Sequence, residues 1–166
     1  MQNSNRKLIV AGIAGNIMEW YDFAVYGYFA VVIGQHFFPS DNPTTSIVAS
    51  FGAFAAGFLM RPVGSVIFGH LGDKIGRKQA LTVSVLMMAI PTFLIGVMPG
   101  FDQIGVAAAV LMVLLRMLQG VSVGGEYTTS ITFLIEHAPT GKRGLMASWS
   151  VWGAILGILL GSAVGA

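Results

Sequence analysis

The sequence predicts an all-α integral membrane protein, and three observations lead to this fold class. Hydrophobic residues make up 55% of the chain and charged residues 10%, whereas soluble domains typically carry about 25% charged residues. The mean hydropathy is +0.77, and the apolar residues are gathered in five long runs. Too little polar surface remains to solvate a water-facing exterior, which excludes a soluble globular domain.

Each of the five runs is long enough to cross a bilayer, because a spanning helix needs about 20 mostly apolar residues. Helices are expected because backbone amides in lipid have to be satisfied within the segment, and no alternating pattern of about ten residues indicates a barrel. The sequence predicts one membrane domain over residues 1–166, with spans at about 8–33, 46–71, 80–98, 104–135 and 145–166. The polar connections are short, so consecutive helices should be antiparallel.

The ends of the chain bear on its organisation. The first apolar run continues beyond the length of a signal peptide, which predicts a retained span. The last run stops at Ala166 without a polar flank or a basic anchor. We therefore expect the chain to be truncated.

Basic residues are distributed asymmetrically among the connections. One set of connections holds seven of the nine lysines and arginines, and the alternate set holds none. The seven are Arg6, Lys7, Lys74, Arg77, Lys78, Lys142 and Arg143. Since such residues favour the cytoplasmic side, the N-terminus, the second-to-third loop and the fourth-to-fifth loop should be cytoplasmic. Short basic clusters between apolar runs, rather than one basic face, argue against nucleic acid as a partner.

Two acidic residues lie about halfway along the first run, where a charge is costly and has to face the interior of the bundle. Glu19 and Asp22 are three residues apart and share a helix face with Gly12, Gly15 and Tyr26. This pattern favours a packed, functional face. The alternative is that the two acids and the aromatic residues between them form an interfacial cluster at a helix end.

The fourth run carries a second polar set. Arg116 lies about 12 residues into it, at a depth similar to that of Glu19 in a slab of about 30 Å, so an ion pair between them fits the helix rise. Gln119 follows one turn later and Tyr127 returns near the same face, whereas Glu126 points about 80° away and should serve another contact. These residues are candidates for substrate binding or proton coupling. The alternative is a structural ion-pair network between helices.

Two further features predict packing rather than chemistry. Arg61 precedes Pro62, and proline frees a backbone carbonyl that a guanidinium can bond, so Arg61 is expected to be a structural anchor. In the last run, glycines recur every four residues, which allows another helix to approach closely. They are Gly153, Gly157, Gly161 and Gly165.

The connection over residues 69–78 reads Gly-His-Leu-Gly-Asp-Lys-Ile-Gly-Arg-Lys. By itself it is a positive-inside loop with glycine caps. As a pattern it resembles the signature loop of the major facilitator superfamily. The matching residues are Gly69, Gly72, Asp73, Lys74, Gly76, Arg77 and Lys78. The resemblance implies a cytoplasmic latch in which the aspartate engages a helix terminus and an arginine, and Asp73 and Arg77 take these roles.

Two more stretches narrow the resemblance. Residues 15–23, Gly-Asn-Ile-Met-Glu-Trp-Tyr-Asp-Phe, and residues 116–127, Arg-Met-Leu-Gln-Gly-Val-Ser-Val-Gly-Gly-Glu-Tyr, are similar to the metabolite:proton symporter family within that superfamily. The loop at 136–144 fits the same family. Its members carry proline and betaine, citrate, 2-oxoglutarate or shikimate.

This resemblance implies a transporter with twelve spans in two halves and a substrate site near the membrane midplane. The chain then supplies about five transmembrane helices of the N-terminal half, and its first and fourth helices line the cavity. Missing C-terminal helices, or a partner chain, would be needed to complete the pathway.

The function implied is proton symport of a small organic acid or a zwitterion, such as proline or betaine, across the inner membrane. Glu19 or Asp22 is expected to gain and lose the proton, and Arg116 either tunes that group or binds a substrate carboxylate. The alternative is a non-transporting truncated remnant, or a helical subunit that requires a partner.

Other function classes find no support in the sequence. An enzyme is not expected, and neither is a metal site, because the three histidines lie apart in different loops. No phosphate-cradling loop is present either. The expected partners are the lipid bilayer and a small-molecule substrate, and no cofactor is expected because a proton gradient would supply the energy.

Overall fold

The structure is a computed structural model that describes the backbone of residues 2–166 and the side chains of residues 10 and 13–126 and 129–166. It is a bundle of helices, and the described residues contain no strand. The helices are α1 (Gln2–Phe37), α2 (Pro43–Ile75), α3 (Arg77–Val97), α4 (Phe101–Ile104), α5 (Val106–Glu136) and α6 (Arg143–Gly165). The predicted all-α fold class is confirmed.

Local sequence signals set the boundaries of the helices. Asn42 caps α2 by accepting a hydrogen bond from the Thr44 backbone N–H at 2.9 Å, and Pro43 occupies the first turn. Gly76, at a φ of 90°, separates α2 from α3. Gly105, at a φ of 60°, separates the short α4 from α5. The span predicted at 104–135 is therefore interrupted at its start, because glycine adopts a backbone conformation that the helix does not use.

Four of the described helices, α2, α3, α5 and α6, are long and apolar enough to cross a membrane. They correspond to the second to fifth predicted spans. The described part of α1 is not among them, and it carries Glu19 and Asp22 well inside the helix. Four of the five predicted spans thus correspond to helices with the length and composition to cross a membrane. The span bounds, and the crossing by α1, stay predictions.

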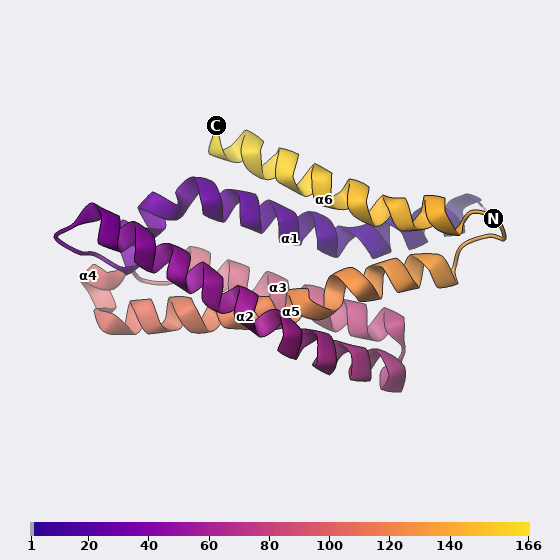
Figure 1. Cartoon of the computed structure of the whole chain (residues 1–166), viewed down its shortest axis with the longest axis horizontal. Helices are drawn as coiled ribbons and strands as arrows, with labels where there is room; N and C mark the ends of the chain where they lie inside the picture. Colours follow the sequence, from indigo (N-terminus) through magenta and orange to yellow (C-terminus); the bar gives the residue numbers. More distant parts are fainter. Residues whose placement is uncertain (1) are drawn as a thin grey trace.

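The helices form two groups that lie against each other. Figure 1 shows α1 and α6 running side by side, with α2, α3 and α5 packed along them. α5 lies mainly against α2 and α3 and also contacts α1 and α6, so it joins the two groups. Consecutive long helices are antiparallel, as the short connections predicted.

The basic connections gather at one end of the bundle. In Figure 1 the N-terminus, the turn between α2 and α3 and the loop between α5 and α6 lie at the same end. These three segments hold the seven lysines and arginines of the connections. The arrangement fits a membrane protein with one basic side, and the assignment of that side to the cytoplasm stays a prediction.

Glycines allow the helices to approach closely. In α6, a Cβ at Gly157 or Gly161 would meet backbone atoms of Tyr21, and one at Gly153 would meet Ile13. The glycine series of the last run therefore allows the close helix approach that its spacing predicted, and the helix that it approaches is α1. In α2, a Cβ at Gly57 would lie 2.8 Å from the Arg116 carbonyl oxygen.

The exterior and interior of the bundle divide as expected for a protein in lipid. Large apolar side chains face outward, and Leu59, Val66 and Phe93 are each more than two-thirds exposed, at 77%, 75% and 68%. Polar side chains are buried instead, among them Asn16 and Gln119. Such burial needs a partner or a function for each polar group.

Candidate functional site

The centre of the candidate site is an ion pair between α1 and α5. Arg116 donates through Nη1 to Asp22 Oδ2, and the two residues are 6% and 8% exposed. The Arg116 guanidinium also lies 4.0 Å from the centre of the Tyr26 ring. The Tyr26 hydroxyl donates to the Ser50 carbonyl oxygen at 2.7 Å, which fixes the ring between α1 and α2. The arginine is thus held by a charge on one side and an aromatic face on the other.

The geometry shows which acidic residue of α1 pairs with Arg116. The helix rise made Glu19 compatible with Arg116, but the structure pairs Arg116 with Asp22. Depth alone could not choose between two acids on the same face of α1, because the choice also depends on how α1 is rotated against α5. The two acids lie inside a continuous helix, which excludes the alternative of a cluster at a helix end.

Glu19 faces the other intramembrane arginine. Arg61 Nη2 on α2 lies 3.8 Å from Glu19 Oε1, and the Arg61 guanidinium lies over the Phe58 and Phe23 rings at 3.8 and 4.7 Å from their centres. The structure thus gives Arg61 a carboxylate neighbour that its sequence position did not indicate, and its anchoring role stays a prediction. Its terminal nitrogen faces a carboxylate, and the same Nη2 makes no hydrogen bond among the described residues.

Gln119 and Glu126 both lie on α5, and they contact different helices. Gln119 donates through Nε2 to the Thr92 hydroxyl of α3 at 2.7 Å. Glu126 is fully buried, and its carboxylate occupies the space where a Cβ at Gly15 would lie. Glu126 thus contacts a different neighbour from Gln119, and its role in substrate binding or proton coupling stays a prediction. The side chain of Tyr127 lies outside the described residues, and Gly12 is described only by its backbone in α1.

One polar junction was missed by the sequence analysis. Asn16 of α1 donates through Nδ2 to the hydroxyls of Ser130 on α5 and Ser150 on α6, and these two hydroxyls lie 3.1 Å apart. The junction ties three helices together one turn from Glu19. Asn16 lies inside the motif at residues 15–23, so the sequence contained an indication of this junction. It was overlooked because a neutral amide in a hydrophobic run is less costly to bury than a charge.

A recess opens beside the Glu19–Arg61 pair. Its volume is about 380 Å³, and it is lined by Glu19, Trp20, Arg61, Pro62, Ser65, Val123 and Gly124. The size falls in the range of about 300–1,000 Å³ that is typical of small-molecule sites. Three of its buried polar atoms have no hydrogen-bond partner among the described residues. They are Glu19 Oε2, Trp20 Nε1 and Arg61 Nη2.

A second hollow lies deeper, between the two arginines. It is lined in part by Phe23, Phe58, Arg61, Arg116 and Gln119, and its volume is about 10 Å³. This is close to the space that one water molecule needs. This hollow touches the arginine of each ion pair but offers no room for a solute in this conformation.

The signature loop lies at the basic end of the bundle. Arg77 Nη2 and Asp73 Oδ1 lie 3.0 Å apart, so the two residues of the predicted latch contact each other across the turn at Gly76. A Cβ at Gly72 would lie 3.0 Å from Arg77 Nη1, so the missing side chain leaves room for the guanidinium. Lys74 and Lys78 are exposed, and a Cβ at Gly69 would meet nothing.

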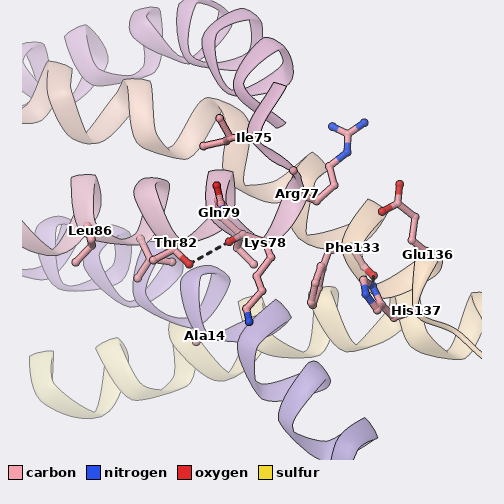
Figure 2. A pocket seen from close by; sticks show the side chains of 13 residues that line it. Ala14, Ile75, Arg77, Lys78, Gln79, Thr82, Leu86, Phe133, Glu136 and His137 are labelled. Atoms are coloured by element: carbon pink, nitrogen blue, oxygen red, sulfur yellow. Dashed lines mark hydrogen bonds between the residues drawn. The ribbon is translucent and has the colours of Figure 1, made fainter. Parts of the chain in front are cut away.

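A wide cavity of about 980 Å³ lies next to this loop, between α1, α3 and α5. Figure 2 shows the Lys78 side chain crossing it toward Ala14 of α1, with Phe133 of α5 and His137, which follows the end of that helix, on the far wall. His137 Nδ1 lies 2.8 Å from the Phe133 carbonyl oxygen. The described residues hold no cluster of three or more acidic or histidine side chains suited to a metal ion.

The chain is similar to known transporters. A family model described as "Sugar (and other) transporter" matches residues 7–166. The glycine betaine/proline/ectoine/pipecolic acid transporter OusA of Dickeya dadantii is 47% identical over 159 residues, which are 96% of this chain and 32% of that protein.

Two relatives from Escherichia coli (strain K12) carry different solutes by name. The proline/betaine transporter is 46% identical over 96% of this chain and 32% of its own length. The alpha-ketoglutarate permease is 45% identical over 92% of this chain and 35% of its own length. The chain thus spans about a third of the length of the curated relatives it matches. No solved structure matches it.

Proposed function

Because the chain belongs to the sugar (and other) transporter family of the major facilitator superfamily, we propose that it forms the solute-binding helices of a secondary transporter for a small zwitterion. The family and the relatives are transporters and not enzymes, as the sequence predicted. The chain is a multi-pass membrane protein. The substrate, the driving ion and the activity of the whole protein are the parts that we propose.

The recess beside Glu19 and Arg61 is the observation that carries this proposal. It combines an acidic oxygen, Glu19 Oε2, with two donors, Trp20 Nε1 and Arg61 Nη2, and none of the three atoms has a hydrogen-bond partner among the described residues. Buried polar groups without partners are costly, so a ligand that satisfies them gains affinity. A solute with a positive and a negative group matches this set.

The chemistry of each wall suggests how a zwitterion would bind. Its carboxylate would accept hydrogen bonds from the Arg61 guanidinium and the Trp20 indole N–H, because charge-assisted hydrogen bonds to arginine are strong. Its cationic nitrogen would face Glu19 and the aromatic ring of Trp20, since cations are attracted to carboxylates and to aromatic faces. Proline and betaine have this charge pattern, and relatives of the chain carry them by name.

A dicarboxylate is the competing substrate class. One relative is named as an alpha-ketoglutarate permease, and alpha-ketoglutarate is a dicarboxylate. Such an anion would bind to Arg61 but would be repelled by the Glu19 carboxylate at the same recess. The combination of one acid and one base therefore favours a zwitterion.

Binding of labelled solutes to the protein, expressed from its own gene and purified, tests the substrate class. We expect betaine or proline to bind, and Arg61→Gln to weaken that binding about tenfold or more, because a hydrogen bond to a charged group is worth about 1.5–3 kcal/mol. Arg143→Gln is the matched control, since Arg143 is exposed at the start of α6. Preferential binding of 2-oxoglutarate would overturn the zwitterion assignment, and equal losses in both variants would overturn the site.

We also propose proton symport across the inner membrane, with the N-terminus on the cytoplasmic side. The basic connections at one end of the bundle support this orientation. Carboxyl groups buried beside arginines support proton coupling. A small change in the distance to the arginine can change whether the protonated or the ionised carboxyl group is more stable. Asp22 is compensated by the close Arg116, whereas Glu19 has the more distant Arg61.

Further helices would complete the pathway, either in the same protein or in a partner chain. The relatives are about three times as long as the matched region, which supports this proposal. Native gel electrophoresis combined with an uptake assay tests it. A monomer of these helices alone that transports solute would contradict it, and uptake that requires a larger assembly would support it.

A further inference from the structure

Glu126 of α5 is a buried carboxyl group that neither ion pair uses. It is fully buried, and both of its oxygens, Oε1 and Oε2, lack a hydrogen-bond partner among the described residues. Burial of an ionised carboxylate without a partner is far more costly than burial of the neutral acid. Glu126 therefore needs either a bound proton or a cation, and the Arg116 guanidinium is already paired with Asp22.

Among the side chains that the structure describes, no cation is paired with Glu126. Glu19 on α1 is the charged residue that acts on it electrostatically, and its charge has the same sign. Arg61 on α2 faces Glu19, and Arg116 on the same helix as Glu126 is bound to Asp22. The charged residues of α3 and α6 lie in the first turns of these helices. Lys78 of α3 extends toward Ala14, the neighbour of Gly15, but it forms no ion pair with Glu126 in the described part of the chain.

The count of charges in this buried set leads to one proton. Three buried carboxyl groups, those of Glu19, Asp22 and Glu126, lie near the buried guanidinium group of Arg116 and the partly exposed one of Arg61. One bound proton balances the charge. Asp22 already has a close cation and Glu19 a more distant one, so Glu126 is the carboxyl group left for it.

Protonation of Glu126 affects how α1 and α5 pack, because its carboxyl group lies between these two helices. The carboxyl group lies against Gly15 and takes the place of a side chain there, so α1 and α5 touch through it. A neutral carboxyl group can remain in this dry contact, whereas an anion would be repelled by Glu19 and would require water. Loss of the proton would thus favour separation of α1 from α5 at this level.

We propose that Glu126 holds the exchangeable proton of this chain and that its protonation closes the contact between α1 and α5 at Gly15. The carboxylate takes one proton from water on the side to which the helices are open and forms an O–H bond. It returns that proton to water after the contact reopens. The use of this step in transport rests on the proposed function, but the bound proton can be detected without any transport.

Infrared spectroscopy of the purified protein tests the assignment directly. We expect a band from a protonated, buried carboxyl group in neutral buffer, and we expect Glu126→Gln to remove it. Glutamine has nearly the same shape and keeps the contact with Gly15 but cannot ionise. Glu136→Gln is the matched control, because Glu136 ends the same helix in an exposed position. A band that survives Glu126→Gln and disappears in Glu19→Gln would overturn the assignment.

A second measurement covers the case in which Glu126→Gln does not fold. In the unmodified protein, alkaline buffer should abolish the band. It should also speed hydrogen exchange of the α1 amides near Gly15 by more than the base-catalysed increase measured for amides elsewhere in the bundle. Exchange near Gly15 that rises only as much as at the other amides while the band disappears would overturn the link between the proton and the contact. No band at any pH would overturn the bound proton itself, whatever solute the protein binds.

Discussion

Replacing Arg116 by leucine is expected to destabilise the bundle by about 3–5 kcal/mol, because Asp22 would then be a buried charge without a partner. The pair has little access to solvent, so water cannot take the place of the guanidinium. The Tyr26 ring would also lose the cation that lies over it. Thermal unfolding in detergent measures the effect, and Arg143→Leu, an exposed arginine of α6, is the control that should show little change.

The double replacement Asp22→Asn/Arg116→Leu separates the cost of an unpaired charge from the value of the pair itself. Replacing both partners of a buried pair often restores stability, whereas removing one does not. We therefore expect the double variant to unfold close to the wild type but to lose solute uptake. A double variant as unstable as Arg116→Leu would show that the stability comes from contacts of the arginine other than the ion pair.

Replacing Gly120 by leucine should have the second large effect, because α2 crosses α5 at this glycine. A Cβ at Gly120 would overlap with the backbone carbonyl group of Gly57. The obstacle is backbone, so no side-chain rotation relieves it, and the two helices have to separate. Since overpacking typically costs about 1–3 kcal/mol and occasionally more, the unfolding temperature should fall clearly.

Gly52→Leu is the control for this substitution. Gly52 lies on α2 in an exposed position, and a Cβ there would meet nothing within 4 Å. The control should unfold within experimental error of the wild type, since an added apolar side chain on this face meets lipid or detergent. Equal destabilisation by Gly120→Leu and Gly52→Leu would mean that glycine is needed for a reason other than close approach of α2 and α5.

The fold class could be predicted from sequence because hydrophobic composition and helix length are local properties. Four predicted spans agree with helices long and apolar enough to cross a membrane. The interruption before α5 was missed, because it depends on the backbone conformation of the single Gly105. The glycine series of the last run correctly predicted a close contact, but its partner, α1, could be learned only from the structure.

The candidate site was predicted less completely because it depends on how the helices are rotated against one another. The sequence identified Glu19, Asp22, Arg61 and Arg116 by the cost of charges in lipid, yet it could not pair them. The structure joins Asp22 to Arg116 and places Arg61 beside Glu19. Asn16 was overlooked because a neutral amide raises no such cost until its two serine partners are known.

Solute accumulation driven by an imposed pH gradient tests the central claim most directly. The protein expressed from its own gene would be reconstituted into lipid vesicles, and uptake of labelled betaine or proline would be followed with the outside acidic. We predict accumulation above the external concentration, which a protonophore abolishes. Uptake that is the same with and without the gradient, or no uptake of either solute by a folded protein, would contradict proton-coupled transport by these helices.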